Sequence, residues 1–373
     1  MVFGFLDLGE GGAQRLTLAT CAALRRDRFR PVILCARGEG PLIAPARALG
    51  LDVRTLGRLG RPFDFAAIAL LAEELRALET DILHVPLYSR VSPYFRLAAQ
   101  LAGVPLVVAH DWSLPERLSP LRRSADLLLR RRTRFIAASS AQRRELERSG
   151  VRRESIAVLH AGIDVERFRS GDRQAMRAAL ELEEGRPMAL VPARLVAAKG
   201  HADLISALPS VLAREPRLAV LFAGAGPLAG GLAERLRREG LDASVRLLGH
   251  CERMPDLLAA ADFVVLPSRI EGLPSVLLEA FAAGRAVVAT DAGGVREALT
   301  DGGEGRLVAV GDSAALGDAM VELAAHPRLR DAMAQRGTAR VERDFRLDSA
   351  TRRLEALYDL WLAKVPGRLD RAC

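Results

Sequence analysis

The chain has 373 residues, half of them apolar, and a formal net charge of +8. This length predicts two domains, and the apolar content excludes a disordered chain. The basic residues are almost all arginine, since only Lys199 and Lys364 are lysines. An excess of positive charge suits a nucleotide diphosphate or a phospholipid surface, whereas the absence of basic motifs with interleaved aromatic residues argues against a nucleic-acid partner.

Neither the first residues nor the longest apolar stretch predicts secretion or a membrane span. The segment MVFGFLDLGEGG lacks a charged leader region, and the uncharged stretch Leu97 to Ala109 is too short to cross a bilayer. The cysteines show no metal-ligand spacing, so reduced thiols and a cytoplasmic location are expected.

Short apolar runs alternate with segments of helical periodicity along the whole chain. This alternation predicts an α/β protein with two Rossmann-like parallel-sheet domains facing across a cleft. Strands are expected at residues 31–36, 81–85, 105–110, 134–139 and 155–160, and then at residues 188–193, 218–224, 245–250, 263–267 and 286–290. The predicted domains are residues 1–168 and 169–344, followed by an amphipathic helix within residues 345–373.

Each half contains a glycine-rich turn after a predicted strand. The first holds Gly11 and Gly12 and leads into a helix, and the second is AGAGP at residues 223–227. Such turns let backbone N–H groups approach a phosphate, but they also serve simply to pack loops tightly.

The strongest local pattern is the segment from residue 263 to residue 294. A strand is followed by a loop with Glu271, Pro274 is placed to open a helix, and Glu279 lies inside that helix. A carboxylate ahead of a helix can bind sugar hydroxyls beside free backbone amides, and one on the helix can bind a ribose diol. The alternative is an ordinary loop acid and a solvated helix residue. The predicted donor-binding residues here are Gly272, Leu273, Pro274, Ser275 and Glu279.

Two cations follow the first predicted strand of the second half. Arg194 and Lys199 precede Gly200 and a helix, at the strand edge where a diphosphate leaving group would need neutralising. A compact ammonium in a chain that otherwise uses arginine favours a phosphate contact over a chance surface position.

Two histidines end predicted strands of the first half. His84 reads mainly as a buried structural residue, whereas His110, which precedes Asp111 and Trp112, is a candidate for the site. His160 and Glu304 are expected to have structural and turn roles. No DxD pair, HExxH motif or Cys-His cluster occurs, so a site without metal is expected.

In this order and spacing, the motifs resemble the group 1 glycosyltransferases, family 4 of the sequence classification, which have the GT-B fold. The segments that carry the likeness are GEGGAQR, VVAHD, VLHAGIDVERF, ARLVAAKG, LFAGAGP, PSRIEGLPSVLLEAFAAGRAVVATDAGG and DGGEGRLVAVGD. They span nearly the whole chain. The hinge departs from the family pattern, since HAG stands at residues 160–162 where Pro-Asn-Gly is more common.

The resemblance implies specific roles. Glu271 would contact the donor sugar, Glu279 the ribose, and Arg194 and Lys199 the diphosphate. Gly12, beside Gly11, would supply an amide from the first domain, and His110 would lie near the reacting sugar. The four residues His110, Arg194, Lys199 and Glu271 are therefore the predicted catalytic set.

The resemblance also implies the reaction. Family members transfer a sugar from a UDP or GDP type donor with retention at the anomeric carbon and without a bound metal. The first domain would take the acceptor, the second the donor, and the last helix would cross back onto the first domain. Synthesis of cell-surface polysaccharide or glycolipid is the expected setting.

Two other function classes stay open at this stage. A sugar-nucleotide epimerase or hydrolase of the same fold is one, and a non-catalytic nucleotide- or glycan-binding protein is the other. A NAD-dependent enzyme would need a GxGxxG motif that LGEGGAQ does not supply. The acceptor is open between a glycan, a lipid-linked sugar and a small molecule. The basic, amphipathic stretch Leu121 to Arg134 is either a patch for peripheral contact with an anionic membrane or a plain solvated helix.

Overall fold

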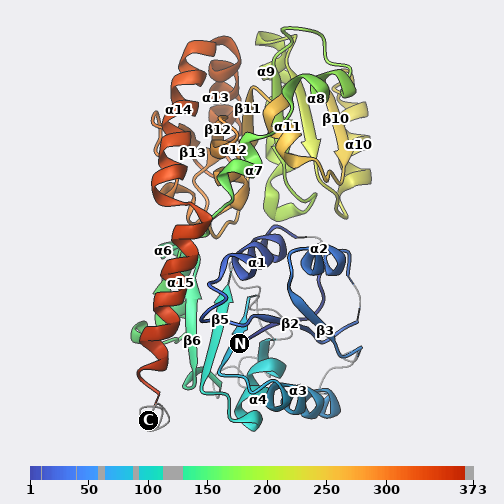
Figure 1. Cartoon of the computed structure of the whole chain (residues 1–373). Coiled ribbons are helices and arrows are strands. Elements are labelled where there is room, and N and C mark those ends of the chain that lie inside the picture. Colours follow the sequence, from blue (N-terminus) through green and yellow to red (C-terminus); the bar gives the residue numbers. More distant parts are fainter. Residues whose placement is uncertain (10, 39, 58–63, 87–91, 112–128, 366–373) are drawn as a thin grey trace. The chain divides into compact units, whose positions relative to one another are not determined.

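The structure, a computed structural model, describes residues 1–365 except residues 10, 39, 58–63, 87–91 and 112–128. The chain forms two compact units (Figure 1). Unit 1 consists of Met1–Gly162 and the chain from Leu347 onward, and unit 2 is Ile163–Arg346. Each unit contains one parallel sheet with helices packed against it, as the alternating sequence pattern predicts.

Unit 1 contains a seven-stranded parallel sheet in the order β3-β2-β1-β4-β5-β6-β7. Its strands are β1 Val2–Phe5, β2 Val32–Cys35, β3 Asp52–Thr55, β4 Ile82–Val85, β5 Leu106–Asp111, β6 Thr133–Ala137 and β7 Ile156–Val158. Its helices are α1 Gly12–Ala23, α2 Ile43–Ala48, α3 Phe65–Ala77, α4 Ser92–Ala102, α6 Ser140–Arg148 and α15 Leu347–Leu362, with the 3₁₀ turn η1 Arg153–Ser155.

Both faces of the unit 1 sheet are buried. Because side chains alternate along a strand, Phe3 and Ile33 enter one core while Val2 and Val32 enter the other. Helices α1 and α15 cover the first face, and α3 and α4 cover the second. A sheet buried on both sides explains the continuous apolar runs that predicted its strands.

Unit 2 contains a six-stranded parallel sheet in the order β10-β9-β8-β11-β12-β13. Its strands are β8 Met188–Pro192, β9 Ala219–Ala223, β10 Val245–Gly249, β11 Phe263–Leu266, β12 Ala286–Thr290 and β13 Gly305–Val308. Its helices are α7 Val165–Arg169, α8 Arg173–Ala179, α9 His201–Arg214, α10 Ala229–Arg238, α11 Met254–Ala260, α12 Ser275–Ala282, α13 Ser313–Ala325 and α14 Pro327–Asp344, with the 3₁₀ turns η2 Ala197–Lys199 and η3 Val295–Glu297.

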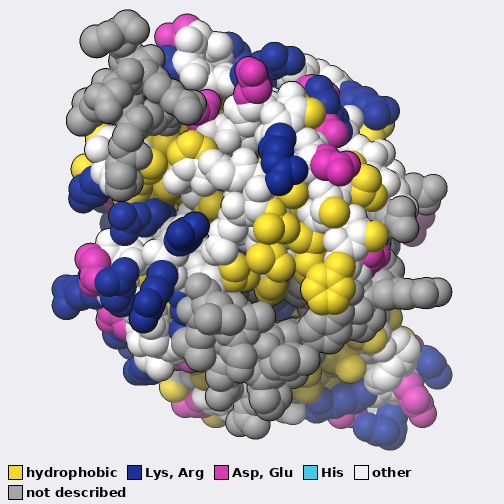
Figure 2. Space-filling model, turned by 90° about the horizontal axis from the view of Figure 1, so that it is seen from below, with side chains coloured by type: hydrophobic (Ala, Val, Ile, Leu, Met, Phe, Trp, Pro, Cys, Tyr) yellow, Lys and Arg dark blue, Asp and Glu magenta, His cyan; other side chains and the backbone are white. Residues whose placement is uncertain are grey.

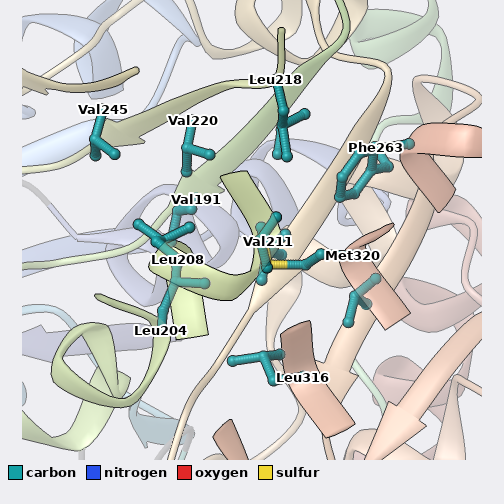
Figure 3. Close-up of a cluster of buried hydrophobic side chains, with 14 of the residues drawn as sticks. Val191, Leu204, Leu208, Val211, Leu218, Val220, Val245, Phe263, Leu316 and Met320 are labelled. Carbon is teal, nitrogen blue, oxygen red and sulfur yellow. The ribbon is translucent and has the colours of Figure 1, made fainter. Parts of the chain in front are cut away.

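The main core of unit 2 lies between its sheet and helices α9 and α13 (Figure 3). Leu204, Leu208 and Val211 repeat at helical spacing along one face of α9, and all three are fully buried. They pack against strand residues such as Val191 and against Met320 of α13. Burying a side chain of this size contributes about 2 kcal/mol each, so this face of α9 fixes the helix that follows the Lys199 loop.

The border between the units differs slightly from the expected one. The chain enters unit 2 at Ile163 rather than after Phe168, and it leaves at Arg346 rather than Asp344. The reason is local: Asp164 caps helix α7 by accepting a hydrogen bond from the N–H of Arg167, and α7 packs on α11 and α12.

The last helix, α15, completes the core of unit 1. Leu354, Tyr358 and Trp361 form its buried stripe and join the cluster that contains the first strands. Glu355, 3 % exposed, accepts hydrogen bonds from the backbone N–H and the guanidinium of Arg25 at the end of α1. Among the described residues, no helix is both long and apolar enough to span a bilayer.

Candidate active site

The loops that follow β8 and β11 meet at the carboxyl edge of the unit 2 sheet. These two strands are neighbours, so both loops start from the same edge. The N–H of Arg269 donates to the carbonyl of Ala198 at 2.8 Å, and the N–H of Gly294 donates to the carbonyl of Gly272 at 2.7 Å. Backbone hydrogen bonds therefore join the loops after β8, β11 and β12 into one surface.

Two glycines make this close approach of backbones feasible. Gly200 has φ 66° and Gly293 has φ 58°, both in the left-handed region that favours glycine. A Cβ at Gly200 would overlap the carbonyl oxygen of Pro267, and one at Gly293 would overlap that of Glu271. These glycines are therefore required by backbone packing and set the position of the loop that carries Glu271.

The predicted catalytic residues Lys199 and Glu271 are brought together by this packing. Their side chains form an ion pair, with Nζ 2.5 Å from Oε1, and they are 21 % and 10 % exposed. Beside them Arg269 donates two hydrogen bonds to Asp203, at 2.7 and 2.6 Å. The Arg269 guanidinium lowers the pKa of the Asp203 carboxyl.

The predicted cation Arg194 has a different environment. Its side chain is exposed in the loop after β8 and has no hydrogen-bond or ion-pair partner within the described part of the chain. The Arg194 guanidinium is thus available to an anionic ligand. The Lys199 ammonium, by contrast, already forms an ion pair with Glu271.

Helix α12 begins where the sequence places it. Pro274 is its N-cap residue, and no side-chain hydrogen bond and no acidic residue occupies its first turn. Gly272, Leu273 and Pro274 are buried, and Ser275 and Glu279 are partly exposed. An uncapped helix start of this kind can donate backbone hydrogen bonds to an anion or a hydroxyl.

The glycines of AGAGP serve loop packing. A Cβ at Gly224 would overlap the carbonyl oxygen of Ala193, and one at Gly226 would overlap that of Leu195. Of the two readings of this turn, the structure gives direct support to tight packing against the loop that carries Arg194.

The first glycine-rich turn, in unit 1, leads into helix α1. Gly11 is the N-cap residue in an extended conformation, Gly12 is the first helical residue and is exposed, and the helix has neither a capping side chain nor an acid in its first turn. A Cβ at Gly11 would overlap the side chain of Gln14. The arrangement suits an anion, and the contact of Gly12 with a diphosphate stays a prediction.

His110 is buried inside unit 1 together with His84. His110 Nδ1 lies 3.2 Å from His84 Nε2, and His84 Nδ1 lies 2.6 Å from the hydroxyl of Tyr358 in α15. Burial lowers the pKa of His84 to about 3, and burial with the neighbouring His84 lowers the pKa of His110. Both rings are therefore neutral at physiological pH. Trp112, named with His110 above, lies outside the described residues.

A small cavity of about 20 Å³ lies beside these histidines. Residues Thr17 and Thr20 of α1 line it, with His160 and the α15 residue Leu354 on other sides. This volume suits about one water molecule. The role of Tyr358 has no local sequence signal, because 274 residues separate it from His84.

One further buried histidine stands out in unit 2. His201, the first residue of α9, is 1 % exposed, and neither ring nitrogen has a hydrogen-bond partner among the described residues. Burial and the nearby Lys199 lower its pKa to about 4. The expected turn role of Glu304 agrees with its contacts, since it accepts hydrogen bonds from the N–H of Thr300 and from Arg340.

Metal-ligating residues do not converge in the described part of the chain, where no group of three or more His, Cys, Asp or Glu side chains is placed to hold an ion. Metal independence stays a prediction. The basic stretch Leu121 to Arg134 is described only from Leu129 onward. Its last residues, Thr133 and Arg134, belong to strand β6, so an amphipathic helix does not extend through them.

Comparison with known proteins identifies families whose sequences match both halves of the chain. The family of group 1 glycosyl transferases matches residues 172–340, and glycosyltransferase family 4 matches residues 10–167. The chain is 31 % identical to D-inositol 3-phosphate glycosyltransferase 2 of Catenulispora acidiphila over 81 % of this chain and 79 % of that protein. It is 34 % identical to the putative glycosyltransferase EpsF of Bacillus subtilis over 53 % of this chain and 54 % of EpsF.

Several relatives match over only part of their length. The chain spans about half of EpsF and of the D-inositol 3-phosphate glycosyltransferase of Nocardia farcinica, 54 % and 52 %. Solved structures share the whole fold: HepE of Anabaena, crystallised with UDP and glucose, has a TM-score of 0.84 at 22 % identity, covering 96 % of this chain and 99 % of HepE. WaaG has a TM-score of 0.76 at 17 % identity, covering 98 % of this chain and all of WaaG. With both halves matched in order and the GT-B fold present, this chain belongs to the group 1 glycosyltransferases of family 4.

Proposed function

We propose that the protein is a retaining glycosyltransferase that moves a sugar from a nucleotide-diphosphate sugar, of the UDP or GDP type, to a hydroxyl acceptor without a bound metal. The observation that carries the proposal is the ion pair of Lys199 with Glu271 at the carboxyl edge of the unit 2 sheet, where the exposed Arg194 lies in the loop after β8. The names of the relatives support it, since they include glycosyltransferases, and HepE was crystallised with UDP-glucose.

In the proposed reaction, the acceptor oxygen bonds to the anomeric carbon on the same face from which the diphosphate departs. The bond between that carbon and the phosphate oxygen breaks, and the leaving phosphate accepts the hydroxyl proton. Positive charge develops on the sugar and negative charge on the diphosphate. Arg194 and Lys199 therefore stabilise the transition state more than the bound substrate, and no protein base is required.

The Lys199–Glu271 pair has a defined part in this scheme. In the structure the Lys199 ammonium pairs with the Glu271 carboxylate. A bound donor offers phosphate oxygens to Lys199 and sugar hydroxyls to Glu271, so each member of the pair gains a new partner. Gly272, Leu273 and Ser275 add backbone N–H donors, and Glu279 binds the ribose.

His110 has a positioning part in the donor sugar site. Its imidazole is neutral because burial lowers its pKa, so it contributes a hydrogen bond rather than a positive charge. Gly12, at the start of α1 beside Gly11, provides a backbone amide for the diphosphate.

Substitution of the cations tests the proposal. Arg194→Ala and Lys199→Ala are each expected to lower kcat/KM about 100-fold, the loss typical of removing one donor to developing negative charge. UDP- and GDP-sugars are first screened for those that raise the melting temperature of the protein. The selected donors are then incubated with candidate acceptors, and the products are identified by mass spectrometry. Unchanged turnover in both variants would contradict the assignment.

The matched control is Arg214→Ala in the same unit. This arginine is half exposed and pairs with Asp318, so its removal is expected to change turnover less than twofold. A second control omits the acceptor: release of free or epimerised sugar as the main product would favour the hydrolase or epimerase alternative. Donor binding without any product would favour a binding protein.

A lipid-linked or membrane-bound glycan acceptor in cell-surface polysaccharide or glycolipid synthesis is the second part of the proposal. One face of the molecule carries hydrophobic side chains beside Lys and Arg side chains (Figure 2). Phe65 of α3 and Leu101 of α4 are 72 % and 55 % exposed. Exposed apolar and basic groups together suit peripheral binding to an anionic membrane from the cytoplasm.

Co-sedimentation with phosphatidylserine vesicles tests this membrane contact. Arg131 and Arg132 are exposed and are changed together to Glu, whereas Arg130 is left intact because its guanidinium binds the carbonyl of Ser149. We expect the bound fraction to fall severalfold, given about 1 kcal/mol per basic residue near such a surface. The charge-matched control changes Arg152 and Arg153 to Glu. Equal binding by wild type and the Arg131/Arg132 variant would argue against the contact.

A further inference from the structure

A buried chain of hydrogen bonds joins the last helix of unit 1 to the end of strand β5. The Tyr358 hydroxyl lies 2.6 Å from His84 Nδ1, and His84 Nε2 lies 3.2 Å from His110 Nδ1. The three side chains are at most 3 % exposed. Phe3 stacks on the His84 ring at 4.9 Å and Tyr358 meets that ring edge-on, so His84 is held in one orientation.

All three groups are neutral at physiological pH. Burial lowers the pKa of His84 to about 3 and also lowers that of His110, while it raises the pKa of the Tyr358 hydroxyl. A neutral imidazole carries one proton on one of its two nitrogens. The chain of hydrogen bonds can therefore run in only two directions.

The Tyr358 hydroxyl distinguishes these directions. Its one hydrogen bond within the described residues is the one to His84. If His84 donated to it, the buried hydroxyl proton would have no acceptor, which costs about 1–3 kcal/mol. Tyr358 therefore donates to His84 Nδ1, so His84 carries its proton on Nε2 and donates to His110 Nδ1. His110 then carries its own proton on Nε2.

We propose that Tyr358 is a positioning residue that, through His84, fixes His110 as a donor at Nε2. The inference rests on the proposed function, in which His110 binds a hydroxyl of the reacting sugar, and it adds the direction of that hydrogen bond. Nε2 of His110 donates to a ligand oxygen and does not accept a proton from the acceptor hydroxyl. This agrees with a reaction in which the leaving phosphate takes that proton.

The alternative is that Tyr358 has only a structural role, in which its side chain packs α15 against the core of unit 1. The two readings differ in what loss of the hydroxyl does to His110. In Tyr358→Phe the ring still packs, but each direction of the chain now leaves His84 Nδ1 unbonded, as an N–H without an acceptor in one and as a nitrogen without a donor in the other. The two tautomers of His110 then approach equal free energy, and a donor at Nε2 is present in only part of the molecules.

Imidazole ¹⁵N NMR of the full-length chain labelled at histidine tests the proposal. In the wild type, His84 and His110 are expected as neutral Nε2–H tautomers from pH 6 to pH 8. In Tyr358→Phe, His110 is expected to show both tautomers in comparable amounts. With a donor and acceptor, kcat should fall about twofold to fivefold while the donor KM stays within about twofold, because only part of the molecules are competent.

The matched control is Thr351→Val, which removes another buried hydroxyl from the same helix. Thr351 is 2 % exposed, and among the described residues its hydroxyl donates to the carbonyl of Leu347 in its own helix and to no other group. This variant should keep the wild-type tautomers and turnover. An equal loss of kcat in Thr351→Val with unchanged tautomers in Tyr358→Phe would show a purely structural role.

The wild-type spectrum by itself can overturn the inference, even if Tyr358→Phe fails to fold. A His110 proton on Nδ1, or a charged ring at pH 7, would be incompatible with it. Absence of any transferase activity with the expected tautomers would count against the proposed function instead, since the spectrum does not depend on turnover.

Discussion

The carboxyl edges of the two sheets are built in different ways. In unit 2, loops after neighbouring strands are joined by backbone hydrogen bonds and glycine contacts, and charged side chains such as Lys199 and Glu271 pair on top of them. In unit 1, neutral rings are buried beneath a helix from the far end of the chain. The first edge carries charged side chains in ion pairs, and the second carries neutral, buried rings joined by hydrogen bonds.

The largest effect is expected from breaking the backbone packing of unit 2. Gly200→Ala places a Cβ against the carbonyl oxygen of Pro267 and forces a left-handed φ on alanine. We expect a loss of about 4 kcal/mol in the free energy of unfolding, together with loss of donor binding, measured by urea denaturation and calorimetry. Gly240→Ala is the matched control, because Gly240 has φ 66° and open space around it. It should cost about 1 kcal/mol, and equal losses in the two variants would show that packing is not the cause.

The opposite edge of the same sheet offers a second test, because there one carboxylate, that of Asp262, serves three guanidinium groups. Asp262 is 11 % exposed, accepts from the N–H of Met188 and pairs with Arg173 at 2.9 Å, with Arg177 and Arg330 each 3.6 Å away. Asp262→Asn should lower the free energy of unfolding by about 3 kcal/mol, because it leaves buried guanidinium groups without their anion.

An exposed ion pair gives the control for Asp262. Asp318 is 70 % exposed and pairs with Arg214, so Asp318→Asn should change the free energy of unfolding by at most about 0.5 kcal/mol. Chemical denaturation of both variants at pH 7 measures the difference. Similar values would mean that burial does not set the strength of the Asp262 cluster.

The two units can also be compared by how their stability depends on pH, because each contains buried histidines. The folded pKa values of His84 and His110 in unit 1 and of His201 in unit 2 all lie below the ordinary value of 6.5. Stability is therefore complete above pH 6.5 and is lost as the pH falls toward the folded values, about 3 for His84 and about 4 for His201. In this range each histidine makes the free energy of unfolding fall by up to about 1.4 kcal/mol for each pH unit of acidification.

Urea denaturation between pH 7 and pH 5 measures these slopes. His201→Leu should reduce the pH dependence of the free energy of unfolding of unit 2 by up to about 1.4 kcal/mol per pH unit and leave that of unit 1 unchanged. The matched control is His326→Gln, which replaces an exposed histidine of the same unit. A slope that persists in His201→Leu would assign the acid sensitivity to other groups.

The parts of the fold that sequence could predict are those with strong local patterns. All ten apolar runs became strands of two parallel sheets, and α12 starts after Pro274 as expected. Three strands, β1, β3 and β13, lie outside these ten runs. The edge strands β3 and β13 contain few apolar residues and are partly exposed. Arg194, Lys199 and Glu271 were found because their loops carry local motifs.

The rest depended on contacts that no local motif reports. The sequence assigns His84 a structural role, but only the folded chain shows that it joins His110 to Tyr358. The ion pair between Lys199 and Glu271 follows from the neighbouring positions of β8 and β11, which the order of strands in the sequence does not give. The ligand contacts of the predicted residues stay predictions.

The division of the chain has a consequence for the order of folding during synthesis. Unit 2 is one continuous segment whose ends are held together, since the N–H of Ile163 donates to the carbonyl of Phe345 at 2.9 Å. It can therefore fold as soon as residue 346 has left the ribosome. Unit 1 is started first but finished last, because Leu354, Tyr358 and Trp361 complete its core. A nascent chain released before Tyr358 would contain a folded unit 2 and a unit 1 that still lacks part of its core.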